Sequence, residues 1–209
     1  MKFLKSAVVM LISFNIAIFI LQFIFGNAFT NQGVLLSSDV WIRPWTLITS
    51  MFLHSSIFHL VFNMYVLLIF GSLLESKIGT KRFLLIYFVS GILAGIVSTF
   101  FYPAVLGASG AIMGVMGVII IIMPDLKVLF FFAIPMPLWV ASLVIVLIDV
   151  VGIFVPSGIA NIAHLAGLAV GLLYGLTLRK EKKIYHKKFS SKRHLQDEDI
   201  DEYFKSGRI

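Results

Sequence analysis

The sequence predicts an all-α polytopic membrane protein with six transmembrane helices, and three observations lead to this fold class. First, apolar residues make up 59% of the 209 residues and charged residues only 13%, whereas a soluble domain is nearer one half apolar and one quarter charged. Second, apolar segments recur at the length of about 20 residues that a helix needs to cross the hydrocarbon core. Third, these segments are continuously apolar rather than alternating, which favours helices over the strands of a membrane barrel.

The six predicted spans run over residues 6–25, 56–74, 83–101, 109–123, 129–150 and 160–178, and a charged tail follows over 179–209. Lys2 and Lys5 precede the first span, as basic residues precede a signal peptide. Its apolar run is longer than the usual signal segment and no clear cleavage site follows, so we expect a retained anchor.

Basic residues predict the orientation of these spans. If there are six, the loops and termini on one side carry Lys2, Lys5, Lys77, Lys81, Arg82, Lys127 and the basic part of the tail. The opposite side carries only Arg43. The positive-inside rule then places both termini in the cytosol, and we expect a multi-pass protein of the cell membrane. Much of the net charge of +7 lies after Arg179, which indicates contact with anionic lipid headgroups rather than with nucleic acid.

A polar residue inside an apolar span costs free energy unless it faces the protein interior and has a partner, and four such residues are candidates for a functional site. They are His59 and Asn63 in the second span, Ser109 in the fourth and His164 in the sixth. A helical rise of about 1.5 Å per residue places all four about 18–24 Å above the cytosolic ends of their spans. Three helices therefore bring them to a similar depth, below the outer surface of the membrane.

The fourth predicted span is short, and at about 22 Å it cannot cross the hydrocarbon core. Its first residue, Ser109, must then lie inside the protein at a buried helix amino terminus. Free N–H groups and the positive end of the helix dipole surround such a position, which suits the stabilisation of an oxyanion.

Glycines at four-residue spacing begin beside Ser109 and His164 and predict close helix packing. Gly110 and Gly114 belong to the first series, and Gly167 and Gly171 to the second. By themselves the glycines indicate only packing, and a single intramembrane serine, histidine or asparagine is more often an interhelical hydrogen-bonding residue than a catalyst. Asp149 is expected near the outer end of the fifth span, and nothing in the sequence places it near His164, so we do not assign it as a catalytic acid.

In combination, the motifs resemble those of the rhomboid family of intramembrane serine proteases. Gly107-Ala108-Ser109-Gly110 resembles its G-x-S-G, the segment from His59 to Asn63 its H-x-x-x-N, and the segment from Ala163 to Gly167 its A-H-x-x-G. Glu75 resembles the glutamate that closes the second span of the family, and Trp45 with Thr49 resembles part of its W-R-x-x-T. The chain departs from the family at Thr46, which replaces that arginine, and at Met113, where some relatives have a tyrosine that stacks on the histidine.

The resemblance implies a dyad of Ser109 as nucleophile and His164 as general base, without a carboxylate third member and without a cofactor or metal. It implies that His59, Asn63 and the Ser109 backbone N–H stabilise the oxyanion. Substrates would be transmembrane protein segments with small, helix-weakening residues, approaching laterally near the second and fifth spans.

Other functions remain as alternatives. The zinc motif H-E-x-x-H is absent, and an aspartyl protease would need a second intramembrane aspartate besides Asp149. A catalytically silent rhomboid-like protein that binds membrane clients is the main alternative, and the intact Ser109 and His164 argue against it. Internal repeats that would favour a transporter are not visible. The sequence does not predict the oligomeric state.

Overall fold

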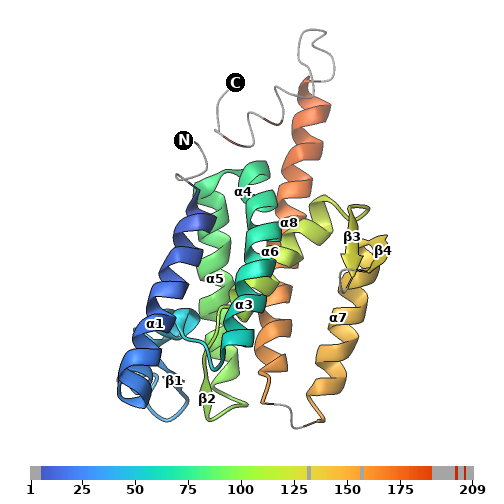
Figure 1. Cartoon of the computed structure of the whole chain (residues 1–209). Helices are drawn as coiled ribbons and strands as arrows, with labels where there is room; N and C mark the ends of the chain where they lie inside the picture. Colours follow the sequence, from blue (N-terminus) through green and yellow to red (C-terminus); the bar gives the residue numbers. More distant parts are fainter. Residues whose placement is uncertain (1–5, 131–132, 156–157, 190–200, 202–204, 206–209) are drawn as a thin grey trace.

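The computed structural model describes residues 6–130, 133–155 and 158–189, together with residues 201 and 205. In chain order the elements are α1 (Ala7–Gly33), β1 (Leu35–Leu36), α2 (Thr46–Thr49), η2 (Ser50–Phe52), α3 (Ile57–Val66), η3 (Leu67–Gly71), α4 (Ser72–Ile78), α5 (Thr80–Ser98), β2 (Ala104–Val105), α6 (Ser109–Ile122), β3 (Lys127–Phe130), β4 (Ile134–Pro137), α7 (Leu138–Gly152) and α8 (Asn161–Phe189). Apart from two short strand pairs, the described chain is mostly helical (Figure 1).

Four helical stretches of the described chain are long and apolar enough to cross a membrane. They are Ala7–Gly33, Ile57–Ile78, Thr80–Ser98 and Asn161–Lys180. The second of these combines α3, the π-helical turn η3 and α4 in one continuous rod. The prediction of a helical multi-pass membrane protein is therefore confirmed. The apolar helices α6 and α7 have only 14 and 15 residues, so six spans stay a prediction.

The fifth predicted span begins too early. The sequence suggested a helix from Leu129 onward, but β3 and β4 form an antiparallel hairpin there, and α7 begins at Leu138. Pro135 and Pro137 explain the difference, because proline lacks a backbone N–H and disfavours helical geometry at the residue before it. Helix α7 is consequently shorter than the predicted fifth span.

The first and last predicted spans differ from the structure in their ends. Helical structure in α1 continues to Gly33 instead of ending at residue 25, but Gly26 interrupts it with a φ of 61° and a ψ of −146°. A positive φ of this kind is readily adopted only by glycine. At the other end, α8 continues past Leu178 to Phe189, through charged residues that are good helix formers.

The centre of the helical bundle is α6, which packs against both α5 and α8 (Figure 1). Its buried side chains include Val115, Val118 and Ile119, each at most 1% exposed. The approach of α8 to α6 is so close that a Cβ atom at Gly167 would overlap the carbonyl oxygen of Gly110. One turn further, a Cβ at Gly171 would overlap the carbonyl oxygen of Gly114, so the backbones of the two helices are in direct contact.

The strands β1 and β2 lie at the end of the bundle where α7 ends and α8 begins, opposite α4 (Figure 1). They pair antiparallel, with Leu35 opposite Val105. The pair joins the segment after α1 to the segment that leads into α6. The irregular chain before α6 is therefore held by another part of the protein.

Candidate active site

Ser109 is the first residue of α6, and the turn before it is held in an unusual conformation. Gly107 has a φ of 123°, in the region that side chains rarely adopt, and its N–H donates to the carbonyl of Ser50 at 2.9 Å. A Cβ at Gly107 would lie 2.8 Å from Cε1 of His59, so a side chain there would also meet this ring. The glycine thus lets the chain turn sharply between the His59 ring and the start of α6.

His164 lies in the first turn of α8 and faces Ser109. Its Nε2 is 2.8 Å from the Ser109 Oγ, within hydrogen-bonding distance. The start of α8 is fixed by the backbone N–H of Ile162, which donates to the Tyr102 hydroxyl at 3.1 Å, and by the glycine contact with α6. Both side chains are partly buried.

Asp149 lies on the other side of His164, which corrects the sequence analysis. The Asp149 Oδ1 is 3.0 Å from the His164 Nδ1, and the two side chains are 6% and 18% exposed. The predicted span ended at residue 150, close to the end of α7 at Gly152, so Asp149 was placed correctly along its helix. An intramembrane aspartate is itself a signal for a buried partner, but hydropathy does not determine which neighbouring helix the side chain faces.

His59 and Asn63 lie on α3, next to the turn that precedes Ser109. The His59 ring contacts the position of Gly107, and its Nδ1 is 3.1 Å from the Ser55 Oγ. Asn63 is 5% exposed, and its Nδ2 donates to the carbonyl of His59 at 2.8 Å. An amide nitrogen carries two N–H groups, so this bond leaves one N–H of Asn63 for another acceptor.

A cavity of about 20 Å³ lies against Ser109. Small residues form much of its wall, including Gly91, Ala94, Gly110 and Ala163. A cavity of this size can hold one water molecule if polar groups line it. Ser109 and Ser50 are the hydroxyl-bearing residues among those that line it.

A family model described as the Rhomboid domain matches residues 42–181, which is more than half of the chain and includes all the site residues. The chain belongs to the rhomboid family. Rhomboid protein 1, mitochondrial, of Saccharomyces cerevisiae is 34% identical over 188 residues, covering 84% of this chain and 54% of that protein. Rhomboid protease GluP of Bacillus subtilis is 34% identical over 149 residues, covering 70% of this chain and 28% of that protein.

Rhomboid protease GlpG of Haemophilus influenzae is similar over a larger part of its own length. It is 29% identical over 140 residues, which cover 66% of this chain and 72% of that protein. The chain spans about half or less of the first two relatives, so they contain further sequence outside the matched region.

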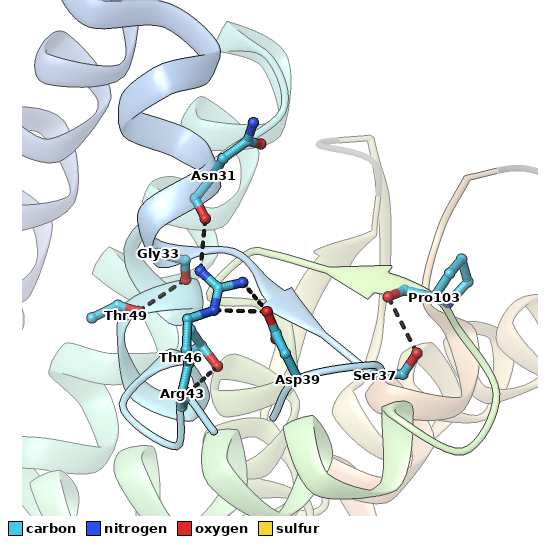
Figure 2. Close-up of polar contacts among 8 residues, drawn as sticks. All are labelled: Asn31, Gly33, Ser37, Asp39, Arg43, Thr46, Thr49 and Pro103. Atoms are coloured by element: carbon cyan, nitrogen blue, oxygen red, sulfur yellow. Dashed lines mark hydrogen bonds and ion pairs between the residues drawn. The ribbon is translucent and has the colours of Figure 1, made fainter. Parts of the chain in front are cut away.

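In this rhomboid chain, Arg43 anchors the loop where the family arginine is replaced by Thr46. Its guanidinium binds the Asp39 carboxylate through Nε at 2.7 Å and Nη2 at 2.6 Å, and Nη1 donates to the carbonyl of Asn31 at 2.9 Å (Figure 2). Thr46 is fully buried, and its hydroxyl donates to the carbonyl of Arg43 at 2.7 Å. The loop is thus fixed by an arginine three residues earlier in the chain.

Two further contacts in Figure 2 connect this rhomboid loop to its surroundings. The Thr49 hydroxyl donates to the carbonyl of Gly33 at 2.9 Å, and the Ser37 hydroxyl to the carbonyl of Pro103 at 3.4 Å. Pro103 belongs to the segment that leads into α6. The loop therefore supports the same segment that positions Ser109.

Glu75 joins three helices at the end of the rhomboid bundle opposite the β1–β2 pair. Its carboxylate accepts from the Ser6 hydroxyl at 2.5 Å, from the Ala7 and Val8 N–H groups at 2.9 and 3.3 Å, and from the Thr80 hydroxyl at 2.7 Å. These donors lie at the amino ends of α1 and α5, where a negative charge is favourable.

Within the described residues, no group of three or more histidine, aspartate or glutamate side chains is close enough to hold a metal ion.

Proposed function

We propose that this protein is an intramembrane serine endopeptidase that cleaves transmembrane segments of membrane proteins, with Ser109 as nucleophile and His164 as general base. The observation that carries the proposal is the distance of 2.8 Å between the Ser109 Oγ and the His164 Nε2. A hydroxyl is a weak nucleophile at neutral pH, and an adjacent base that accepts its proton activates it. The names of GluP and GlpG, both rhomboid proteases, support the same activity.

In the first step, the Ser109 oxygen attacks the carbonyl carbon of the scissile peptide bond while His164 accepts the hydroxyl proton. A tetrahedral intermediate forms, and the former carbonyl oxygen becomes an oxyanion. The imidazolium of His164 then donates its proton to the leaving amine, and the C–N bond breaks. An acyl-enzyme on Ser109 remains.

The oxyanion would be stabilised by the Ser109 backbone N–H, the His59 side chain and the second N–H of Asn63. The first N–H groups of α6 have no acceptor within the helix, which supports the first assignment. The closeness of the His59 ring to Gly107 supports the second. Preorganised donors of this kind are often the largest single contribution to catalysis.

Deacylation requires one water molecule, which His164 deprotonates for attack on the acyl carbon. The cavity beside Ser109 has room for it. Loss of the serine oxygen as leaving group then restores the hydroxyl, with the proton returned from His164. The site is thus regenerated without any further reactant.

In the membrane, the proposal uses six spans, with α6 and α7 as the short ones, and places both termini in the cytosol of a cell-membrane protein. The beginning of α1 and the last turns of α8 lie at the same end of the bundle, which supports an even number of spans (Figure 1). The close glycine contacts of Gly110 and Gly114 with Gly167 and Gly171 would hold the two catalytic helices together. Substrate helices would reach the site between α3 and α7.

The test uses the purified full chain in detergent and in proteoliposomes. Wild type, Ser109→Ala and His164→Ala are each treated with a fluorophosphonate probe and with a panel of transmembrane reporter substrates. Ser98→Ala is the matched control, because this buried serine on α5 donates only to the carbonyl of Gly95 in its own helix.

We expect wild type and Ser98→Ala to react with the probe and to cleave a reporter, and Ser109→Ala and His164→Ala to lose both reactions. Undiminished labelling and cleavage by Ser109→Ala would show that the assignment is wrong. If wild type neither reacts nor cleaves any reporter, the alternative of a catalytically silent binder of membrane clients is favoured.

A further inference from the structure

Three side chains from three helices form a continuous line of polar contacts. The Ser109 Oγ on α6 is 2.8 Å from the His164 Nε2 on α8, and the His164 Nδ1 is 3.0 Å from the Asp149 Oδ1 on α7. The dyad of the proposed function uses only the first contact. The second occupies the remaining ring nitrogen of the base.

We propose that Asp149 is a positioning residue for His164, an inference that rests on the proposed function of this site. Its carboxylate accepts a hydrogen bond from Nδ1–H, and a neutral imidazole then carries a lone pair on Nε2. That lone pair faces the Ser109 hydroxyl and can accept its proton. Asp149 thus fixes both the tautomer and the orientation of the base.

The charge of Asp149 also acts during the reaction. When His164 accepts the serine proton it becomes an imidazolium, 3.0 Å from the carboxylate at Nδ1. The side chains of Asp149 and His164 are only 6% and 18% exposed, so water screens their interaction little. Their ion pair is therefore stronger than the hydrogen bond between Asp149 and the neutral imidazole. The interaction is therefore greater in the charged state that accompanies bond formation, and such a difference lowers the barrier.

If the role of Asp149 were purely structural, its contact with His164 would serve to hold α7 and α8 together. A second contact already joins the end of α7 to the start of α8. A Cβ at Gly152, the last residue of α7, would lie 2.7 Å from the Asn161 side chain at the start of α8. Close packing of Asn161 on Gly152 holds the two helices together one turn beyond Asp149. An apolar residue at 149 would leave that contact in place.

A buried carboxylate is also an unfavourable group for merely connecting two helices, because its burial costs stability. Asp149 is buried, and among the described residues its Oδ2 has no hydrogen-bond partner. An incompletely paired charge in an apolar helix costs stability.

Met113 does not orient the histidine in place of Asp149. It stands where some relatives have a tyrosine beside the histidine, but it packs with Met116 and Leu168 and offers only a weak acceptor. Asp149 is therefore the residue that orients His164.

The experiment compares wild type with Asp149→Asn and Asp149→Leu in the full chain, using kcat and KM for a transmembrane reporter, the rate of fluorophosphonate labelling, and thermal unfolding. Asn keeps one acceptor and removes the charge, and Leu removes both. Ser142→Ala is the matched control, because this buried serine on the same helix donates to the carbonyl of Leu138 and does not contact His164.

We expect Asp149→Leu to lower kcat and the labelling rate together by about 10- to 100-fold, the effect of losing a hydrogen bond to a charged group, with KM within about twofold of wild type. Asp149→Asn should fall between Leu and wild type, and Ser142→Ala should match wild type. If Asp149→Leu keeps kcat and the labelling rate of wild type, or changes only KM and thermal stability, the positioning role is wrong. Labelling and cleavage by Ser109→Ala would instead overturn the proposed function itself.

A second measurement does not depend on the folding of any Asp149 variant. Nitrogen NMR of ¹⁵N-histidine-labelled wild type, with His164 assigned by its absence in His164→Ala, reports which ring nitrogen carries the proton at a pH where the ring is neutral. We expect the proton on Nδ1. A proton on Nε2 would contradict the proposal.

Discussion

The carbonyl oxygen of Gly110 on α6 occupies the place that a Cβ atom of Gly167 on α8 would need. The obstacle is backbone, which cannot rotate away as a side chain can. We therefore expect Gly167→Ala to push α8 away from α6. The free energy of unfolding should fall by about 1–3 kcal/mol or more, since overpacking of a core typically costs this much. Because these helices carry His164 and Ser109, proteolytic activity should fall with it. Unfolding by SDS titration in mixed micelles measures the change in stability.

Gly95→Ala on α5 is the control for that substitution. Its Cβ would lie 3.2 Å from a methyl group of Leu35 and 3.3 Å from one of Leu47, and both side-chain ends can move. We expect a loss of less than about 1 kcal/mol, because small adjustments of this kind are tolerated in cores. Both substitutions improve helix propensity, so equal losses in the two variants would show that the backbone contact of Gly167 does not explain the effect of Gly167→Ala.

Glu75 is expected to hold the ends of α1 and α5 together through its charge. Glu75→Gln keeps the length of the side chain but replaces one acceptor oxygen with a donor that faces the Ser6 hydroxyl or the Thr80 hydroxyl. Loss of charge-assisted hydrogen bonds costs about 1.5–3 kcal/mol. Thermal unfolding should show this loss, whereas Ser76→Ala, which removes an exposed local bond to the carbonyl of Leu73, should change stability little. Equal stability of both variants would contradict the role of the carboxylate.

Much of the helical membrane fold can be predicted from the sequence, because hydrophobic length decides it. Continuous apolar runs predict the regions of α3, α5, α6 and α8, and the predicted span 109–123 agrees with α6 to one residue. The hairpin at residues 127–137 was missed because hydropathy does not distinguish a strand from a helix in a short apolar run. Two prolines in that run were the available signal.

The candidate site divides in the same way. Ser109 and His164 could be assigned as partners from the resemblance of their motifs to those of the rhomboid family and from their similar predicted depth, and the structure brings them within 2.8 Å of each other. Asp149 could not, because hydropathy does not determine which neighbouring helix its side chain faces. Arg43 could not either, since Asp39 lies in an irregular loop whose path back to Asn31 at the end of α1 is not determined by hydrophobic periodicity.

Arg43 is predicted to stabilise that loop through the geometry of its guanidinium. A lysine keeps the charge but cannot bind Asp39 through two nitrogens and Asn31 through a third. We expect Arg43→Lys to lower stability by about 0.5–1 kcal/mol, since the pair is partly exposed. Thermal unfolding of Arg43→Lys, Asp39→Asn and the double variant measures the coupling. Additive losses in the double variant would show that the two side chains do not act together.

His54 should make stability depend on pH. It lies in the loop between η2 and α3, and it is 2% exposed. Burial, assisted by the nearby His59 ring, lowers the pKa of His54 to about 4 from its ordinary value of 6.5. The folded protein therefore keeps His54 neutral at pH values where the unfolded chain protonates it.

The sign of the effect follows from this difference. Well above pH 6.5 neither state binds the proton, and His54 does not affect the pH dependence. Between pH 6.5 and about 4 the unfolded state binds more protons, so stability falls as pH falls, by about 3 kcal/mol in total. Replacing His54 with leucine, of similar volume, should leave stability at pH 7.5 nearly unchanged and flatten its decline toward pH 4.5. An equally steep decline in His54→Leu would assign the pH dependence to another group, and unfolding curves at five pH values across this window distinguish the two outcomes.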